Sequence, residues 1–159
     1  MKEESQLRKD VTLDARLGVL AGVPVGIVNG VLAAWRISAE YQSLPLIVKI
    51  SSGVLVGAVL GAVIGSLLGG GFGFVSRKIP MSSFASKTVI YVVVVWVLIY
   101  WGNVALFGAS SSNLAWYALT NLVSVHLLWA IFFIYFNKES SKWERLFDRL
   151  WFRSAARVK

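Results

Sequence analysis

The sequence contains no cysteine, which excludes disulfide bonds, thiolate metal ligands and cysteine nucleophiles. Acidic residues are missing from the long interior, because none occurs between Glu40 and Glu139. The chain also has a single histidine, His126. Paired carboxylates, HExxH motifs and clusters of metal ligands are therefore lacking. We expect the protein to be no enzyme and to hold no cofactor and no metal.

Apolar residues are in excess. The chain is 57% hydrophobic with a mean hydropathy of +0.68, against about 45–50% apolar residues in a soluble domain. A bilayer crossing needs about 20 apolar residues. We expect four such spans in a transmembrane domain over residues 17–136, at about 17–35, 47–72, 88–107 and 114–136. The fold class predicted is all-α, a four-transmembrane-helix bundle. The β-branched run within 88–107 could instead form a buried strand, but its length favours a helix.

Glycine recurs every four residues in the first two spans. In water each glycine lowers helix propensity by about 1 kcal/mol relative to alanine. In a bilayer the helix persists, and the bare ridge lets another helix approach closely. We therefore expect glycine-zipper packing of the first two helices, either within one chain or between subunits. The ridge residues are Gly18, Gly22, Gly26 and Gly30 in the first span and Gly53, Gly57, Gly61, Gly65 and Gly69 in the second.

This spacing resembles the glycine zippers of several unrelated membrane assemblies. They include pore-forming toxins, mechanosensitive channels and mitochondrial inner-membrane translocases. The resemblance covers only the first two spans and is a packing motif rather than a family signature.

Three polar residues lie inside the expected spans: Asn29, Asn121 and His126. An ionisable group at membrane depth is a functional candidate by default. A proton relay or metal site at His126 would need a partner, and no carboxylate is available within the spans. The other interpretation is hydrogen bonding between helices. Asn29 and Asn121 could bond to each other in this way, or they could line a polar path.

The segment 137–159 is strongly basic. Ser141 and Glu144 fit a capping box that would begin a helix. The helix would be amphipathic and would lie in the membrane interface, held by aromatic side chains and by anionic lipid headgroups. The expected membrane-surface residues are Trp143, Arg145, Phe147, Arg149, Leu150, Trp151 and Arg153. Nucleic-acid binding by the arginines and docking on a cytoplasmic partner are the alternatives; the tryptophans favour lipid, and we expect no nucleic acid as a partner.

Lysine and arginine are distributed unevenly around the spans. The polar segment 1–16 has four, the second loop three and the tail 137–159 seven, whereas the first loop region has two and the third none. The positive-inside rule predicts that both termini are cytoplasmic. This asymmetry favours a bacterial or archaeal plasma membrane.

These features together favour a non-enzymatic membrane protein that works through helix–helix and lipid contacts. An accessory or assembly subunit and an immunity or exclusion protein belong to this class, with a membrane-protein partner or self-association. The alternative is a homo-oligomeric channel or small transporter with a narrow glycine-lined path. The direction of Asn29, Asn121 and His126 would distinguish the two hypotheses.

Overall fold

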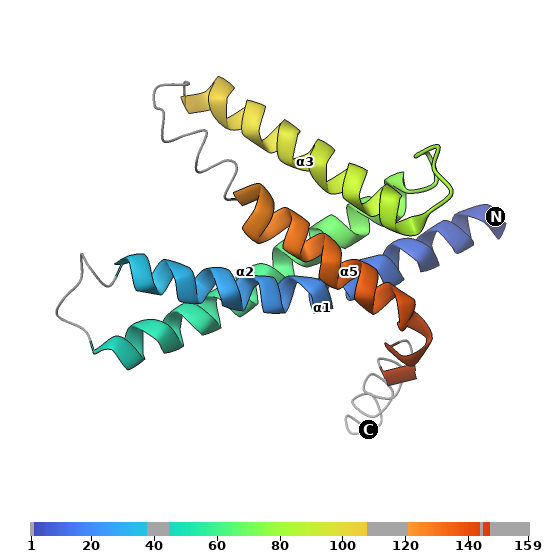
Figure 1. Ribbon diagram of the computed structural model, residues 1–159. Helices are drawn as coiled ribbons and strands as arrows, with labels where there is room; N and C mark the ends of the chain where they lie inside the picture. The colour runs from blue at the N-terminus through green and yellow to red at the C-terminus, as the bar shows by residue number, and fades with distance from the viewer. Residues whose placement is uncertain (1, 38–44, 108–120, 144, 147–159) are drawn as a thin grey trace.

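The computed structural model describes residues 2–37, 45–107, 121–143 and 145–146. The main elements in these residues, all helical, are α1 (Lys2–Ile37), α2 (Leu46–Val75), α3 (Phe84–Phe107), η1 (Leu122–Leu127) and α5 (Leu128–Lys138). Figure 1 shows α1 and α2 side by side, with α5 crossing them. The all-α prediction is therefore confirmed for the described residues, and the strand interpretation of the third span is wrong.

The polar N-terminal segment and the first apolar stretch form one continuous helix. α1 begins at Lys2, passes through Pro24 and ends at Ile37. From the sequence, residues 1–16 were predicted to be a polar segment distinct from the first span. This segment is rich in Glu, Gln, Leu, Arg and Lys, which are good helix formers, so the helix runs through it. Leu17 and Ala21 are fully buried. The first helix therefore extends well beyond its apolar part.

An aromatic cluster holds the other helices to one end of the α1–α2 pair. Phe72 of α2 lies 5.2 Å from Phe84 of α3 and 5.4 Å from Phe133 of α5, measured between ring centroids. Trp129 stacks on Phe133 at 4.5 Å. Edge-to-face and stacked pairs at these separations stabilise a core by about 0.5–1.5 kcal/mol each beyond the area they bury. The core of the molecule therefore lies at the end of the pair where α2 ends and α3 begins.

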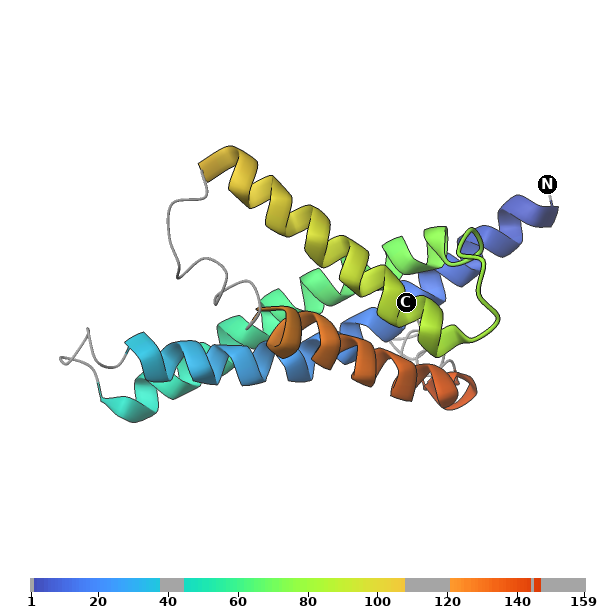
Figure 2. The same cartoon turned by 45° about the horizontal axis from the view of Figure 1, so that its top comes forward.

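α3 diverges from the rest of the molecule along its length. Near its start, Thr88 and Val92 are fully buried, whereas Leu98 and Trp101 further along are largely exposed. Figures 1 and 2 both show α3 close to the other helices at its beginning and well separated from α1 and α2 at its end. One face of α2 is consequently left without a helix against it.

Three of the helices are long and apolar enough to cross a membrane. They are Lys9–Trp35, Leu46–Val75 and Phe84–Gly102. Leu122–Lys138 forms a shorter apolar helix. The fourth span was predicted to begin at residue 114, and residues 114–120 lie outside the described residues. The fourth crossing therefore stays a prediction, while the three long helices are those of a small integral membrane protein.

Candidate functional site

The ridge glycines of α1 and α2 meet each other within the chain. The facing pairs run in opposite directions: Gly18–Gly65, Gly22–Gly61, Gly26–Gly57 and Gly30–Gly53. A Cβ atom placed on Gly26 would lie only 2.8 Å from the carbonyl carbon of Gly57 and 2.8 Å from the Cα of Gly61. Such distances are too short for any side chain. All four α1 ridge glycines lie directly on the backbone of α2, and we call this contact the glycine seam.

The glycine seam continues to Gly69, where the partner is no longer glycine. A Cβ atom on Gly69 would lie 2.9 Å from the carbonyl carbon of Asp14 and 3.0 Å from the Cα of Gly18. At each step the Cα hydrogen of a glycine points toward a carbonyl oxygen of the facing helix. Such Cα–H···O contacts contribute about 0.5–1 kcal/mol each. Attraction between the helices therefore comes from close backbone contact rather than from interlocked side chains.

Two glycines outside the seam, Gly70 and Gly102, have ordinary surroundings. A Cβ atom on Gly70 would meet only the Cβ of Ala15, at 3.6 Å, which is a normal van der Waals contact. A Cβ atom on Gly102 would meet nothing within 4 Å. The chain thus contains internal controls in which a glycine can gain a methyl group without disturbing a neighbour.

The polar residues within the apolar helices form hydrogen bonds inside the chain. The Asn29 side-chain amide donates to the carbonyl oxygens of Val25, at 2.9 Å, and Ser124, at 3.0 Å. The Nδ1 atom of the buried His126 lies 3.4 Å from the backbone carbonyl oxygen of Asn121. The hydrogen bond to Ser124 therefore joins α1 to η1, and His126 bonds to the backbone of Asn121, the residue just before η1.

Two features of the contact between α1 and the η1–α5 segment were not identified from the sequence. One is the π-helical segment η1, whose wider turn offers carbonyl groups to partners outside the helix. The other is Trp129, which is buried and donates from its indole Nε1 to the carbonyl oxygen of Gly18, at 3.3 Å. A tryptophan in the middle of a span is a usable sequence signal, because a buried indole N–H requires an acceptor.

The polar end of the molecule is held by pairs that join segments far apart in the chain. Arg77 forms an exposed ion pair with Asp10, linking the segment after α2 to α1. The Nζ atom of Lys87 donates to the carbonyl oxygen of Ser76, at 3.0 Å. Exposed ion pairs contribute only about 0–1 kcal/mol. These contacts determine where the segment between α2 and α3 lies, and they contribute little to the free energy of folding.

The described part of the C-terminal tail differs from the predicted capping box. The carbonyl oxygen of Glu139 accepts the backbone N–H groups of Lys142 and Trp143, so Glu139 occupies the N-cap position. Ser141 lies inside the turn, and its prediction as the N-cap is wrong. The Trp143 ring packs against Phe136, at 5.3 Å between centroids. Arg145 donates to the carbonyl oxygen of Ser141; the predicted surface residues Phe147, Arg149, Leu150, Trp151 and Arg153 lie outside the described residues.

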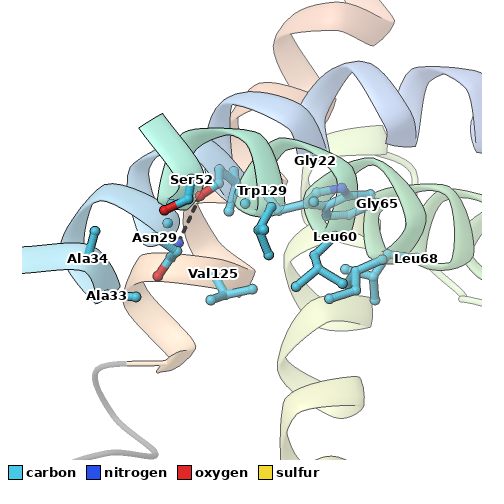
Figure 3. A pocket seen from close by; sticks show the side chains of 18 of the residues that line it. Gly22, Asn29, Ala33, Ala34, Ser52, Leu60, Gly65, Leu68, Val125 and Trp129 are labelled. Atoms are coloured by element: carbon cyan, nitrogen blue, oxygen red, sulfur yellow. Dashed lines mark hydrogen bonds between the residues drawn. The ribbon is translucent and has the colours of Figure 1, made fainter. Parts of the chain in front are cut away.

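A cavity of about 520 Å³ runs along the glycine seam, lined by α1, α2, η1 and α5 (Figure 3). Most of its wall is glycine and aliphatic side chain, with Val125 and Trp129 contributed by η1 and α5. Leu60 lines the cavity and is nevertheless 54% exposed, so the cavity is open along α2. We call this cavity the seam groove.

The polar residues of the seam groove lie at one end. They are Asn29, Lys49 and Ser52. Because Gly30 faces Gly53 across the seam, the neighbouring residues Asn29 and Ser52 are brought to the same level. Lys49 lies one turn of helix before Ser52 in α2. The seam groove is therefore amphiphilic, with a cation at one end and hydrocarbon along the rest.

No group of three or more histidine, aspartate or glutamate side chains lies close enough together to bind a metal ion within the described ranges. No protein-family model matches the chain, and no curated protein or solved structure matches it. The function must therefore be argued from the seam, the groove and the exposed faces alone.

Proposed function

We propose that this chain is a non-enzymatic integral membrane protein that acts through helix–helix and lipid contacts. It serves as an accessory or assembly subunit, or as an immunity or exclusion protein, beside another membrane protein. Both termini are cytoplasmic, and the basic tail contacts anionic lipid headgroups. The distribution of lysine and arginine supports this orientation and a bacterial or archaeal plasma membrane.

The observation that carries the proposal is the internal use of the glycine ridges. Each of the four α1 glycines faces an α2 glycine of the same chain, as expected of a glycine zipper within one subunit. The side of each ridge that contacts the facing helix is therefore not available to line a path between subunits. The hydrogen bonds of Asn29 likewise end on carbonyl groups of the same chain, at Val25 and Ser124. Both observations favour a contact protein over a homo-oligomeric pore.

The surface left for a partner is the face of α2 that α3 does not cover. Large apolar side chains recur there every four residues, at Leu55, Val59, Val63 and Leu67. All four are more than half exposed. Residues spaced by four lie on one side of a helix, so they form a continuous apolar stripe. Another transmembrane helix would pack against such a stripe through van der Waals contact.

Two measurements test the proposal. A photoreactive amino acid at Val59 in native membranes should form one discrete protein adduct, and the same residue at the buried Ala21 should form none. In nanodiscs, the purified chain should have the mass of a monomer or of an assembly that carries no ion flux. A discrete homo-oligomer that conducts ions, with flux lost in Asn29→Leu, would overturn the proposal in favour of a pore.

A further inference from the structure

We propose that Asp14 of α1 is a proton-binding site, and that proton uptake from the cytoplasm lets the polar end of α1 pack against α2. The inference goes beyond the proposed function, because it holds for a contact protein and for a pore alike. It shares with that proposal only the placement of the N-terminus on the cytoplasmic side of a membrane.

Asp14 is an acidic residue that is buried at the edge of the apolar part of α1. It lies three residues before Leu17, where the apolar run begins, and one turn of helix before Gly18. Only 9% of its surface is exposed. Aspartate is almost never buried to this extent unless it is paired. The burial of Asp14 therefore requires a physical explanation.

The contact that buries Asp14 is made by glycine backbone of α2. A Cβ atom on Gly73 would lie 2.9 Å from the Oδ2 atom of Asp14 and 3.2 Å from its Cβ atom. A Cβ atom on Gly69, one turn earlier, would lie 2.9 Å from the carbonyl carbon of Asp14. The carboxyl group therefore occupies the space that a side chain at position 73 would fill.

The charge of an ionised Asp14 has no compensation at this contact. Among the described residues, Asp14 forms no hydrogen bond and no ion pair. The charged group that acts on it is Asp10, one turn earlier in α1, and like charges four residues apart repel each other. Arg77 is bonded to Asp10 rather than to Asp14. An isolated carboxylate is strongly disfavoured in an apolar contact, so we expect a cation to neutralise it.

Titratable groups on the surrounding elements do not supply this cation. The charged residue of α2 is Lys49, which lies at the opposite end of that helix. In α1, Arg16 is two residues from Asp14 and therefore lies on a different side of the helix. The groups in the segment after α2, at the beginning of α3 and at the end of α5, none of which bonds to Asp14, are Lys78, Lys87, Tyr91, Lys138 and Glu139.

The surroundings of Asp14 favour a proton over other cations. A metal ion needs several oxygen ligands, and no group of three or more acidic or histidine side chains could hold one in the described parts of the chain. An arginine or lysine of a partner needs an open face of the carboxyl group for its donors, and Gly73 covers one carboxylate oxygen. A proton needs neither further ligands nor room.

Proton uptake at Asp14 is an acid–base step without a redox change. A hydronium ion on the cytoplasmic side gives its proton to a carboxylate oxygen, which leaves a neutral carboxyl group and a water molecule. The neutral group can stay against Gly73, whereas the ionised group must reach water. α1 then moves away from α2 at Gly73, while the seam from Gly18 to Gly30 stays closed. Packing of this end of α1 therefore binds a proton, and it weakens as the pH rises.

The test is infrared spectroscopy of the full chain in nanodiscs, with aspartate isotopically labelled at its carboxyl carbon. The aspartates of the chain are Asp10, Asp14 and Asp148, so the variant Asp10→Asn/Asp148→Asn keeps only Asp14. In mildly acidic buffer this variant should show the carbonyl stretch of a protonated carboxylic acid, and mildly alkaline buffer should remove it. An ordinary exposed aspartate is already ionised in both buffers.

Two spectroscopic results would overturn the proposal. A protonated signal that is absent in both buffers would show that Asp14 stays ionised, and a cation from a partner would then have to be sought. A signal that persists in alkaline buffer would show that the proton is never released, so it could not change the packing of α1.

The packing of α1 has a separate readout, which is the midpoint of unfolding by sodium dodecyl sulfate. The midpoint of the wild type should shift to a lower denaturant fraction in mildly alkaline buffer. Asp14→Asn has a neutral amide at either pH and should shift less, whereas the control Glu139→Gln should shift like the wild type. Equal shifts in the wild type and Asp14→Asn would overturn the proposal. Neither readout uses a partner protein or ion flux, so its failure leaves the proposed function as it stands.

Discussion

Replacing the seam glycine Gly61 by alanine should destabilise the protein far more than the same replacement at Gly70, which lies in the same helix outside the seam. A Cβ atom on Gly61 would lie 2.8 Å from the Cα of Gly26 and 3.0 Å from the carbonyl carbon of Gly22. Carbon atoms attract each other best at about 3.5–4.0 Å. The carbonyl oxygen of Gly22 lies closer still. The helices must therefore separate by about 1 Å in Gly61→Ala, a gap that forfeits roughly half of each contact's attraction.

The expected cost follows from this separation. Overpacking of a tight interface costs about 1–3 kcal/mol, and the weakened Cα–H···O contacts on either side add to it. Gly70→Ala makes the same chemical change in the same helix but brings the new methyl group to an ordinary 3.6 Å contact with Ala15. Its free energy of unfolding should stay within about 0.5 kcal/mol of the wild type.

The assay is unfolding of the purified protein in mild detergent by titration with sodium dodecyl sulfate, followed by circular dichroism. Gly61→Ala should shift the midpoint to a lower denaturant fraction, and Gly70→Ala should not. In the double variant Gly22→Ala/Gly61→Ala, the second methyl group should cost less than the first, because the helices are already apart. Equal stabilities of Gly61→Ala and Gly70→Ala would refute the argument that the seam is packed backbone to backbone.

Three further predictions concern the pairing, the cross-helix hydrogen bond and the orientation. Because the chain has no cysteine, Ala34→Cys/Gly53→Cys should form a disulfide within one chain. A Cβ on Gly53 would lie 2.9 Å from that of Ala34, and the separation of the helices that a side chain at Gly53 requires would bring the two Cβ atoms to the roughly 3.5–4.5 Å of a disulfide; a covalent dimer on a non-reducing gel would contradict pairing within the chain. Asn29→Leu should lower the free energy of unfolding by about 0.6–2 kcal/mol, because two hydrogen bonds are lost; unchanged detergent stability would contradict this. Pro45→Cys should react with an impermeant maleimide on intact cells and Ser82→Cys only after permeabilisation, and the reverse pattern would place the termini outside.

The helices themselves could be predicted from the sequence with little ambiguity. Apolar runs of this length, and glycine at every fourth position, indicate where α1, α2 and α3 lie. The third span was recognised as a helix despite its β-branched residues, since the run is too long for a typical strand. The predicted boundary at residue 17 was wrong, because α1 is continuous there. A change from polar to apolar composition does not end a helix when no helix-breaking residue is present.

The register of the seam could not be predicted. A shift of four residues along α2 would bring glycine opposite glycine again, so the ridge spacing alone allows several pairings. Contacts elsewhere fix the observed register, including the Trp129 indole on the Gly18 carbonyl oxygen and the Asn29 amide on Ser124. The divergence of α3 depends similarly on where Phe84 packs against Phe72. Such tertiary contacts leave no periodic pattern in the sequence.

The glycine seam also has a consequence for the order in which the protein is made. All its contacts join two helices that are neighbours in the chain, and the helices are separated only by residues 38–45. Local contacts of this kind form early, and chains fold from the N-terminus during synthesis. The α1–α2 hairpin can therefore close in the bilayer while α3 is still on the ribosome. The later helices then pack against an α1–α2 pair that has already formed. The acceptor for the Trp129 indole, the carbonyl oxygen of Gly18, is therefore in position before Trp129 is inserted.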